Sequence, residues 1–438
     1  MDGRGAVSTA ALLAAGLAML PLVQAQSKID TAFQKFWAAD SPATAARAVD
    51  EVVKSGISFD EGLRRLKLGR TYAAAKDGVV QMSNRTSDGI EHNFAVTIPA
   101  GYDPSRRYQV RFQLHGGVGG RTDNKPRGNG QIGTLAGADG QFYVIPYAWN
   151  DAPWWSDDQV LNLHAIVDTL KRKYNIDENR VAVSGVSDGG TGAYFIAMRD
   201  TTPYASFLPL NGYIMVLANG EIDDGLNFPN NLRDKPLFVI NGGKDRLYPI
   251  SIVEPYTRHL MRNGVEIAYF PQAEGQHNTA WWPEMKDPFE KFVADHPREP
   301  SPDKLTWEAA DAGHNRAHWL VIDSFGTAPG EPKALPDANL FTDSLGTDLL
   351  FGRPKVPGRM DLVRSGNTVQ AATKGVSAFT LLVSPDKFDL NQPVKVTVNG
   401  REVFNARVQP SLETLLKWAA RDNDRTMLYA AEIKIKLK

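Results

Sequence analysis

One short stretch limits the possible folds of this chain more than any other. Residues 180–194 read RVAVSGVSDGGTGAY, an apolar β-rich run followed by an apolar helical pattern. Between the two, residues 185–189 have the form G-x-S-x-G. In so sharp a turn, side chains at the glycine positions would collide with the neighbouring strand and helix, and the serine adopts a strained backbone conformation. The stretch therefore predicts a strand, turn and helix that expose the Ser187 hydroxyl at the edge of a sheet.

The residues around this turn alternate predicted strands with predicted helices. Apolar runs at 180–184 and 236–240 lack polar alternation, which is typical of parallel strands covered on both faces. A helix predicted over 156–174 begins at Ser156 and carries its apolar residues on one face. Repeated strand and helix units over residues 88–298 predict an α/β domain with a doubly wound, mostly parallel sheet.

Two further segments flank this domain. Residues 26–87 carry apolar side chains at helical spacing and predict an N-terminal helical segment of two or three short helices. Residues 299–438 carry closely spaced strand signals, a hairpin signal at Asn399-Gly400 and one helix over 411–420. They predict a C-terminal β-rich domain resembling a sandwich. The stretch 326–358, rich in Gly, Pro and Asp, predicts a long loop or connector.

Residues 1–25 have the pattern of a secretory signal peptide. An apolar run from Ala10 to Leu20 follows Arg4, and the small side chains of Val23 and Ala25 predict cleavage near Ala25. The run is shorter than the roughly 18 apolar residues that a membrane span needs. We expect a secreted or periplasmic protein, of bacterial origin because an exported chain without cysteine cannot use disulfides.

The composition excludes several classes of protein. Lys and Arg total 49 against 50 Asp and Glu, so the net charge of −1 provides no long-range field to attract nucleic acid. The chain has no cysteine, which removes thiolate catalysis and cysteine-bound metals, so a nucleophile must be an oxygen or a lysine. We predict no cofactor and no metal. His314 and His318 lie at chelating spacing, but no Glu stands between them and a predicted strand follows.

Ser187 requires two partners, because a serine hydroxyl is a poor nucleophile until a base takes its proton. Asp245 follows one predicted strand and His277 follows the next. Both therefore lie in loops at the carboxyl ends of strands, with one strand and helix unit in each gap, in the order serine, acid, histidine. Asp223 and Asp224 are the competing acids, but no clear strand precedes them.

A second glycine-rich run follows the predicted strand at 108–114. Residues 115–120 read HGGVGG, and glycines there let backbone N–H groups approach a carbonyl oxygen that gains negative charge during a reaction. With this HGG run and the GVSDG turn at 185–189, the chain resembles the α/β-hydrolase superfamily over residues 88–298. Within that superfamily it is similar to the secreted esterases, the feruloyl esterases and polyhydroxybutyrate-depolymerase-like enzymes.

The resemblance implies a role for each of these positions. By it, Ser187 is the nucleophile, Asp245 the acid and His277 the base of a catalytic triad, and the backbone N–H groups of Asp188 and Gly117 form the oxyanion hole. The C-terminal domain departs from the smallest members of the superfamily. The resemblance therefore leaves the substrate class and the partner of that domain open.

Two tryptophan pairs supply candidates for substrate contact. They are Trp154-Trp155 and Trp281-Trp282, and the second pair closely follows His277. Tryptophan is mostly a core residue, so we expect at least one ring of each pair to be buried. For the other ring we predict a wall of the substrate pocket, because aromatic rings offer large apolar contact. The substrate-binding candidates are Trp155, Trp281 and Trp282.

Three functions remain open at this point. The leading one is an exported serine hydrolase that cleaves small or polymeric carboxylic esters through an acyl-enzyme, with aryl or polymeric esters preferred. A peptidase of the prolyl-oligopeptidase type shares the fold and triad order, but no repeat of about 40 to 50 residues indicates its propeller. The third is a catalytically inactive hydrolase fold that binds a partner through the β-rich domain.

Overall fold

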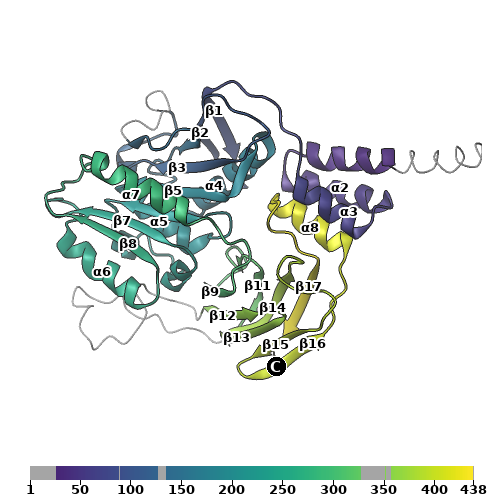
Figure 1. The fold of residues 1–438 in the computed structure, drawn as a ribbon. Coiled ribbons are helices and arrows are strands. Elements are labelled where there is room, and N and C mark those ends of the chain that lie inside the picture. The colour runs from purple at the N-terminus through teal and green to yellow at the C-terminus, as the bar shows by residue number, and fades with distance from the viewer. Residues whose placement is uncertain (1–25, 88, 127–134, 327–350, 352–356, 438) are drawn as a thin grey trace, which may run out of the picture.

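The computed structural model describes residues 26–87, 89–126, 135–326, 351 and 357–437. An eight-stranded sheet forms the centre of the larger domain, in the order β1-β2-β4-β3-β5-β6-β7-β8 (Figure 1). β2 runs antiparallel to both of its neighbours, whereas β3 to β8 are parallel. The strands are β1 (Gly78–Arg85), β2 (Glu91–Ile98), β3 (Tyr108–Leu114), β4 (Phe142–Pro146), β5 (Ile176–Val186), β6 (Ser206–Leu210), β7 (Leu237–Gly242) and β8 (Ile267–Gln272). This is the predicted doubly wound sheet.

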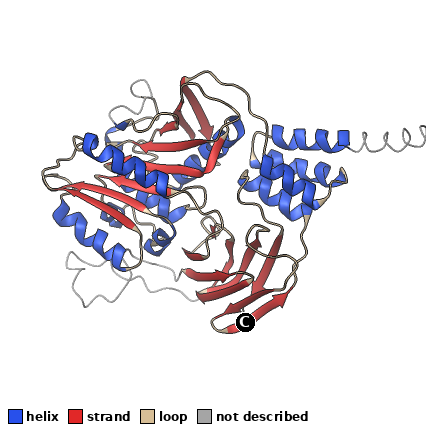
Figure 2. Cartoon of the chain, viewed as in Figure 1, coloured by secondary structure: helices blue, strands red, loops and turns tan. Residues whose placement is uncertain are grey.

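Helices cover both faces of the sheet (Figure 2). In β5, Val181 and Val183 contribute to the same core as residues of α4, α5 and α6, whereas Ala182 contributes to a core with residues of α7. Successive side chains of a strand point to opposite faces, so α7 covers one face and the other three helices lie on the opposite one. Their bounds are α4 (Asp157–Lys173), α5 (Asp188–Arg199), α6 (Ile250–Arg262) and α7 (Trp282–Asp295), with short 3-10 helices η1 (Val118–Gly120), η3 (Ile214–Ala218) and η4 (Pro229–Asp234).

The sheet begins earlier than predicted. β1 pairs along its whole length with β2, from Gly78 opposite Ile98 to Arg85 opposite Glu91. The expected boundary at residue 88 therefore falls inside a hairpin of the main sheet. β1 is an edge strand whose side chains are exposed or half-buried, so its sequence carries little of the hydrophobic alternation that marks a strand.

The C-terminal domain consists of two sheets that share one core, with Trp307 and Trp319 among its buried residues. Asn399 and Gly400 both have positive φ, as the predicted hairpin turn requires. The predicted loop at 326–358 lies mostly outside the described residues. The strands are β9 (Lys304–Ala309), β10 (Arg316–Ala317), β11 (Leu320–Phe325), β12 (Gly358–Ser365), β13 (Thr368–Lys374), β14 (Val376–Val383), β15 (Val394–Val398), β16 (Arg401–Ala406) and β17 (Ala431–Lys436).

The N-terminal helices pack against a helix from the other end of the chain. Residues 26–38 are helical, and α2 (Pro42–Lys54) and α3 (Phe59–Leu68) follow. Together they bury their apolar faces against α8 (Leu412–Asp422), the helix that interrupts the C-terminal strands (Figure 1). The predicted segment is thus helical up to α3, and its core is completed by α8. The predicted signal peptide at 1–25 lies outside the described residues.

A buried charge cluster joins α8 to the larger domain. The carboxylate of Asp424 accepts hydrogen bonds from Arg298 at 2.9 Å and from Lys171 on α4 at 3.1 Å, and all three side chains are buried. Burial by itself raises the pKa of Asp424, but the two cations outweigh it and hold this pKa well below its usual range. The charges are paired, as buried charges must be.

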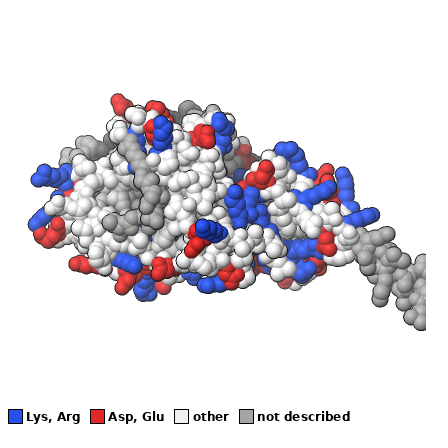
Figure 3. Space-filling view, turned by 90° about the horizontal axis from the view of Figure 1, so that it is seen from above, with Lys and Arg blue, Asp and Glu red and all other residues white. Residues whose placement is uncertain are grey.

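The described surface mixes both signs of charge. On the face seen in Figure 3, Lys and Arg side chains alternate with Asp and Glu around uncharged areas. This distribution agrees with the net charge of −1. In the part of the chain that the structure describes, we find no helix with both the length and the apolar character for crossing a membrane.

Candidate active site

The strand, turn and helix predicted around Ser187 are present. Ser187 lies between β5 and α5 with φ 58° and ψ −119°, a backbone region that non-glycine residues rarely adopt. A Cβ atom at Gly185 would lie 2.1 Å from the carbonyl oxygen of Gly189, and one at Gly189 would lie 2.2 Å from that of Leu114. Both positions therefore require glycine, and the tight turn holds Ser187 half-buried at the carboxyl edge of the sheet.

Three of the predicted site residues meet at this edge. His277 Nε2 lies 2.8 Å from Ser187 Oγ, and His277 Nδ1 lies 2.7 Å from Asp245 Oδ2. Asp245 is 3% exposed, and its other carboxylate oxygen accepts the backbone N–H groups of Leu247 and Tyr248. Because the carboxylate accepts from Nδ1, the Nε2 lone pair faces the serine hydroxyl. The residues come from the loops that follow β5, β7 and β8, so the strand ends bring them together.

The competing acids lie elsewhere. Asp224 forms an ion pair with Arg199, and its carboxylate accepts the N–H of Leu226. Asp223 accepts hydrogen bonds from Gly225 and Asn227. These hydrogen bonds stabilise a turn beyond β6, whereas His277 contacts Asp245.

Two buried asparagines that sequence reasoning missed hold the loops of this site. Asn211 follows β6 with φ 48°, and its amide donates to the carbonyl oxygen of Asn278, the residue after His277, at 2.8 Å. Asn241 at the end of β7 donates to the carbonyl oxygen of Gly212 at 3.1 Å. Both are fully buried. Asparagine tolerates positive φ and can mimic a backbone donor, which is the signal that could have identified Asn211.

The HGG run forms a loop that is hydrogen-bonded to residues following β4. The N–H of Ala148 donates to His115 Nε2 at 3.1 Å, so Nδ1 carries the proton and donates to the carbonyl oxygen of Gly116 at 2.9 Å. Trp154 Nε1 donates to the carbonyl oxygen of His115 at 2.7 Å. Because C=O and N–H point in opposite directions in a trans peptide, the N–H of Gly117 points away from the His115 ring.

The same loop passes directly against the serine turn. A Cβ atom at Gly116 would lie 2.9 Å from Ser187 Cβ. Gly117 has a left-handed backbone with φ 68°, and the N–H of Val118 donates to Asp188 Oδ2 at 2.7 Å. Asp188 is the first residue of α5, where backbone N–H groups have no acceptor within the helix. The two backbone positions named for an oxyanion hole thus lie on adjoining segments.

Two of the three predicted pocket tryptophans lie in the core. Trp281 and Trp282 are 6% and 5% exposed and belong to the core beneath α7. The Trp282 ring packs edge-on against Phe289, and its Nε1 donates to the carbonyl oxygen of Ala136 at 3.2 Å. α7 begins at Trp282, and the ring lies in the core that the buried face of α7 helps to form. The expectation that this pair supplies an open wall is therefore corrected, whereas Trp155 is half-buried beside the main core.

Replacing Trp282 with alanine is accordingly expected to act on stability. Removing a buried tryptophan lowers the free energy of unfolding by about 3–5 kcal/mol, because the transfer term and the cavity term add. The ratio of kcat/KM between two ester substrates should stay as in the unmodified protein. Chemical denaturation and ester kinetics check this, with Trp155→Ala as the half-buried comparison. A stable Trp282→Ala variant with altered ester preference would contradict the core assignment.

A tyrosine that the sequence did not single out lies beside the histidine. The Tyr248 ring meets the His277 ring edge-on with centroids 5.7 Å apart. The centroid of the Tyr213 ring lies 5.6 Å from that of Tyr248. Burial raises the pKa of Tyr248, and the charges of Asp188 and Asp245 raise it further. Tyr248 follows Asp245 in the same turn, so its place near the histidine is a consequence of the loop that carries the acid.

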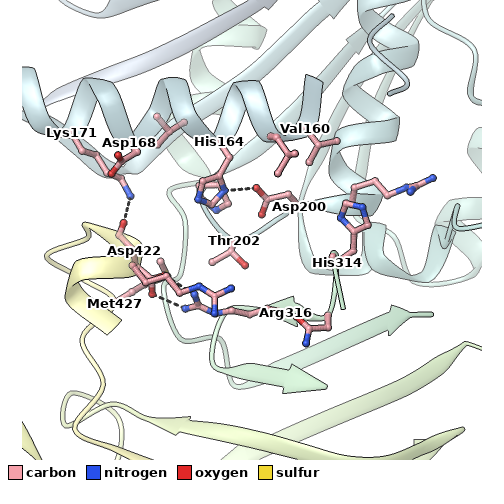
Figure 4. Close-up of a pocket in the computed structure, with 17 residues that line it drawn as sticks. Val160, His164, Asp168, Lys171, Asp200, Thr202, His314, Arg316, Asp422 and Met427 are labelled. Carbon is pink, nitrogen blue, oxygen red and sulfur yellow. Dashed lines mark hydrogen bonds and ion pairs between the residues drawn. The ribbon is translucent and has the colours of Figure 1, made fainter. Parts of the chain in front are cut away.

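A separate cavity of about 250 Å³ lies where α4 meets the C-terminal domain (Figure 4). Ion pairs form much of its wall, including His164 with Asp200 at 2.7 Å and Arg316 with Asp422 at 2.5 Å. Ser187 does not line it. These charged side chains pair with one another, and apolar residues such as Val160 and Met427 complete the wall between the two domains.

The eight-stranded, mostly parallel sheet and the strained serine turn after β5 define an α/β-hydrolase fold, as the resemblance predicted. Comparison with known proteins agrees with this class, although no protein-family model matches the chain. "Probable feruloyl esterase C" of Aspergillus terreus is 24% identical over 208 residues, which are 45% of this chain and 73% of that protein. The chain thus has an α/β-hydrolase fold and is similar in sequence to a protein named as an esterase.

Other similar proteins share shorter or more distant regions. "Probable dipeptidyl-aminopeptidase B" of Chaetomium globosum is 33% identical over 121 residues, which are 24% of this chain and 13% of that protein. A solved thermostable esterase has a TM-score of 0.41 at 20% identity and covers 50% of this chain and 63% of its own. The chain thus spans less than two thirds of these two proteins.

Proposed function

We propose that this protein is a serine hydrolase that cleaves carboxylic esters through an acyl-enzyme, with Ser187 as nucleophile, His277 as base and Asp245 as the orienting acid. The observation that carries the proposal is the pair of short contacts from His277, 2.8 Å to Ser187 Oγ and 2.7 Å to Asp245 Oδ2. The serine hydroxyl is within hydrogen-bonding distance of the histidine, and the histidine is within hydrogen-bonding distance of the carboxylate. This arrangement activates a serine for nucleophilic attack. The esterase-named relative supports the choice of reaction.

The chemistry follows from these contacts. His277 Nε2 takes the Ser187 proton as Oγ bonds to the ester carbonyl carbon, and Asp245 stabilises the imidazolium that results. The carbonyl oxygen gains negative charge, and we assign the N–H groups of Asp188 and Gly117 to receive it. His277 then returns the proton to the departing alkoxide, which leaves as the alcohol. Water repeats the sequence on the acyl-enzyme and releases the acid, so the serine is restored.

We further propose that aryl or polymeric esters are the preferred substrates. Tyr248 places a half-buried ring beside His277, and Trp155 follows Trp154, which is hydrogen-bonded to the HGG loop. Stacking on such rings adds about 0.5–1.5 kcal/mol beyond area burial for a planar group. These two residues replace Trp281 and Trp282 as candidates for the pocket wall.

A panel of substrates tests the reaction class. We expect labelling of Ser187 by a fluorophosphonate, and a higher kcat/KM for feruloyl and short p-nitrophenyl esters than for long-chain glycerides and prolyl amides. Tyr248→Ala and Trp155→Ala should lower the ratio of kcat/KM for aryl esters to kcat/KM for the other esters. Preferred cleavage of the amide would favour the peptidase reading, to which the 33% identity with a dipeptidyl-aminopeptidase points. Absence of labelling would favour an inactive binding protein.

We also propose that the protein is exported and that its mature chain begins at Gln26, from the apolar run and small residues of positions 1–25. The intact mass of the protein recovered from the medium or periplasm tests this. A protein recovered with Met1 in the cytoplasm would overturn the proposal.

A further inference from the structure

We propose that the Asp188 carboxylate is a positioning residue that ties the HGG loop to the nucleophile turn and so places the N–H of Gly117 for the oxyanion. The inference rests on the proposed function. It concerns the Asp188 side chain, whereas the oxyanion-hole assignment concerns its backbone N–H. Asp188 Oδ2 accepts the N–H of Val118 at 2.7 Å, across 70 residues of sequence.

With the bond from Val118 to Asp188, both residues that flank Gly117 contact the serine turn. On one side, Gly116 lies against Ser187, where an added Cβ would come within 2.9 Å of the serine Cβ. On the other side, Val118 is bonded to Asp188, the residue directly after Ser187. The distance and direction of the Gly117 N–H relative to Ser187 Oγ therefore depend on both contacts.

The glycine positions in the middle of this loop face open space. A Cβ atom added at Gly117, Gly119 or Gly120 would meet no heavy atom within 4 Å. Glycines lose the most conformational freedom on ordering, so the loop needs explicit anchors. Val118 supplies one through its buried side chain, 1% exposed, and a second through its N–H bond to Asp188. Without the bond to Asp188, Val118 keeps its buried side chain and the bond that its carbonyl oxygen accepts from the N–H of Arg121 at 3.0 Å, and the peptide between Gly117 and Val118 is freer to turn.

The chemistry of the side chain gives the inference a distinctive signature. A carboxylate beside a site where negative charge develops opposes that charge, although the N-terminus of α5 partly compensates the carboxylate itself. An amide oxygen in the same place would accept the Val118 N–H without the opposing charge. A role in positioning therefore predicts that asparagine rescues what alanine loses, whereas a role of the charge predicts that asparagine fails as alanine does.

The experiment compares Asp188→Ala with Asp188→Asn in the full chain, using a p-nitrophenyl ester. We expect Asp188→Ala to lower kcat on the order of 10- to 100-fold, because it misplaces an oxyanion donor without removing it, with KM little changed. Asp188→Asn should recover most of that loss. The affinity for a trifluoromethyl ketone, which forms an oxyanion on Ser187, should fall in parallel with kcat/KM in the alanine variant, a change that a merely structural role would not produce.

The matched control is Asp103→Ala. Asp103 also accepts a backbone N–H, that of Ser105 at 2.8 Å, but it lies at the opposite end of β3 from the HGG loop. The kcat of Asp103→Ala should therefore remain within about twofold of that of the unmodified protein. If Asp188→Ala fails to fold, Asp188→Ser takes its place, since serine suits a helix start but its hydroxyl ends one atom short of Val118.

Two results would overturn the inference: a kcat for the alanine or serine variant equal to that of the unmodified protein, or an asparagine variant as impaired as the alanine one. Fluorophosphonate titration separates these from failure of the proposed function. If the unmodified protein does not react with the reagent, the proposed function itself is wrong.

Discussion

Ser187→Ala is expected to lower ester turnover by as much as ~10⁶-fold while the protein stays folded. The hydroxyl is the atom that bonds to the substrate, and members of a triad act as a unit, so removing one removes nearly the whole effect. Alanine adopts the strained turn at φ 58° no less readily than serine, and the glycine contacts on either side are unchanged. Thermal unfolding should therefore match that of the unmodified protein within a few degrees.

Steady-state kinetics with a p-nitrophenyl ester provide the measurement, and fluorophosphonate labelling should be lost together with turnover. Ser187→Cys is a useful companion because the chain contains no cysteine, so a thiol reagent would then report the accessibility of that one position. Turnover by Ser187→Ala at the rate of the unmodified protein would show that another residue is the nucleophile.

Asp245→Asn is expected to lower kcat on the order of 10⁴-fold, by imposing the wrong histidine tautomer. The N–H groups of Leu247 and Tyr248 already bind Asp245 Oδ1, so they would hold the oxygen of an asparagine amide in the same place. The amide NH₂ would then face His277 Nδ1 and require it to accept. The imidazole proton moves to Nε2, which can no longer take the proton of Ser187.

Asp223→Asn is the control, since Asp223 accepts hydrogen bonds from Gly225 and Asn227 in a turn beyond β6. Its kcat should remain within about threefold of the unmodified protein, as for most substitutions away from a reacting group. A large loss there, with Asp245→Asn still active, would reassign the acid.

The parts of this site that could be predicted are those whose geometry is determined by residues close together in the sequence. Gly185 and Gly189 are dictated by a turn of five residues, so the turn is visible in the sequence. The positions of Asp245 and His277 followed from the rule that parallel strands end at one edge. Trp282 was predicted as a pocket wall because a buried ring and a pocket ring look alike in sequence, and the structure buries it in the core with residues of α7.

Contacts between distant segments could not be predicted from the same patterns. The bond from Val118 to Asp188 and that from Asn211 to Asn278 join loops that meet only once the sheet is assembled. β1 was missed because an exposed edge strand needs no apolar alternation. The amphipathic faces of α2 and α3 were visible as helices, but nothing local identifies α8 as their partner.

The pairing of α2 and α3 with α8 delays the burial of these helices during synthesis of the chain. Their apolar faces leave the ribosome first, yet the surface that covers them, starting at Leu412, is made more than 300 residues later. At a synthesis rate of about 5–20 residues per second, these faces wait for roughly 20 to 70 seconds. During that time they are exposed to any other apolar surface, so their burial depends on completion of the chain. A ribosome that stops before Leu412 releases a product whose first helices have one another but lack the helix that completes their core.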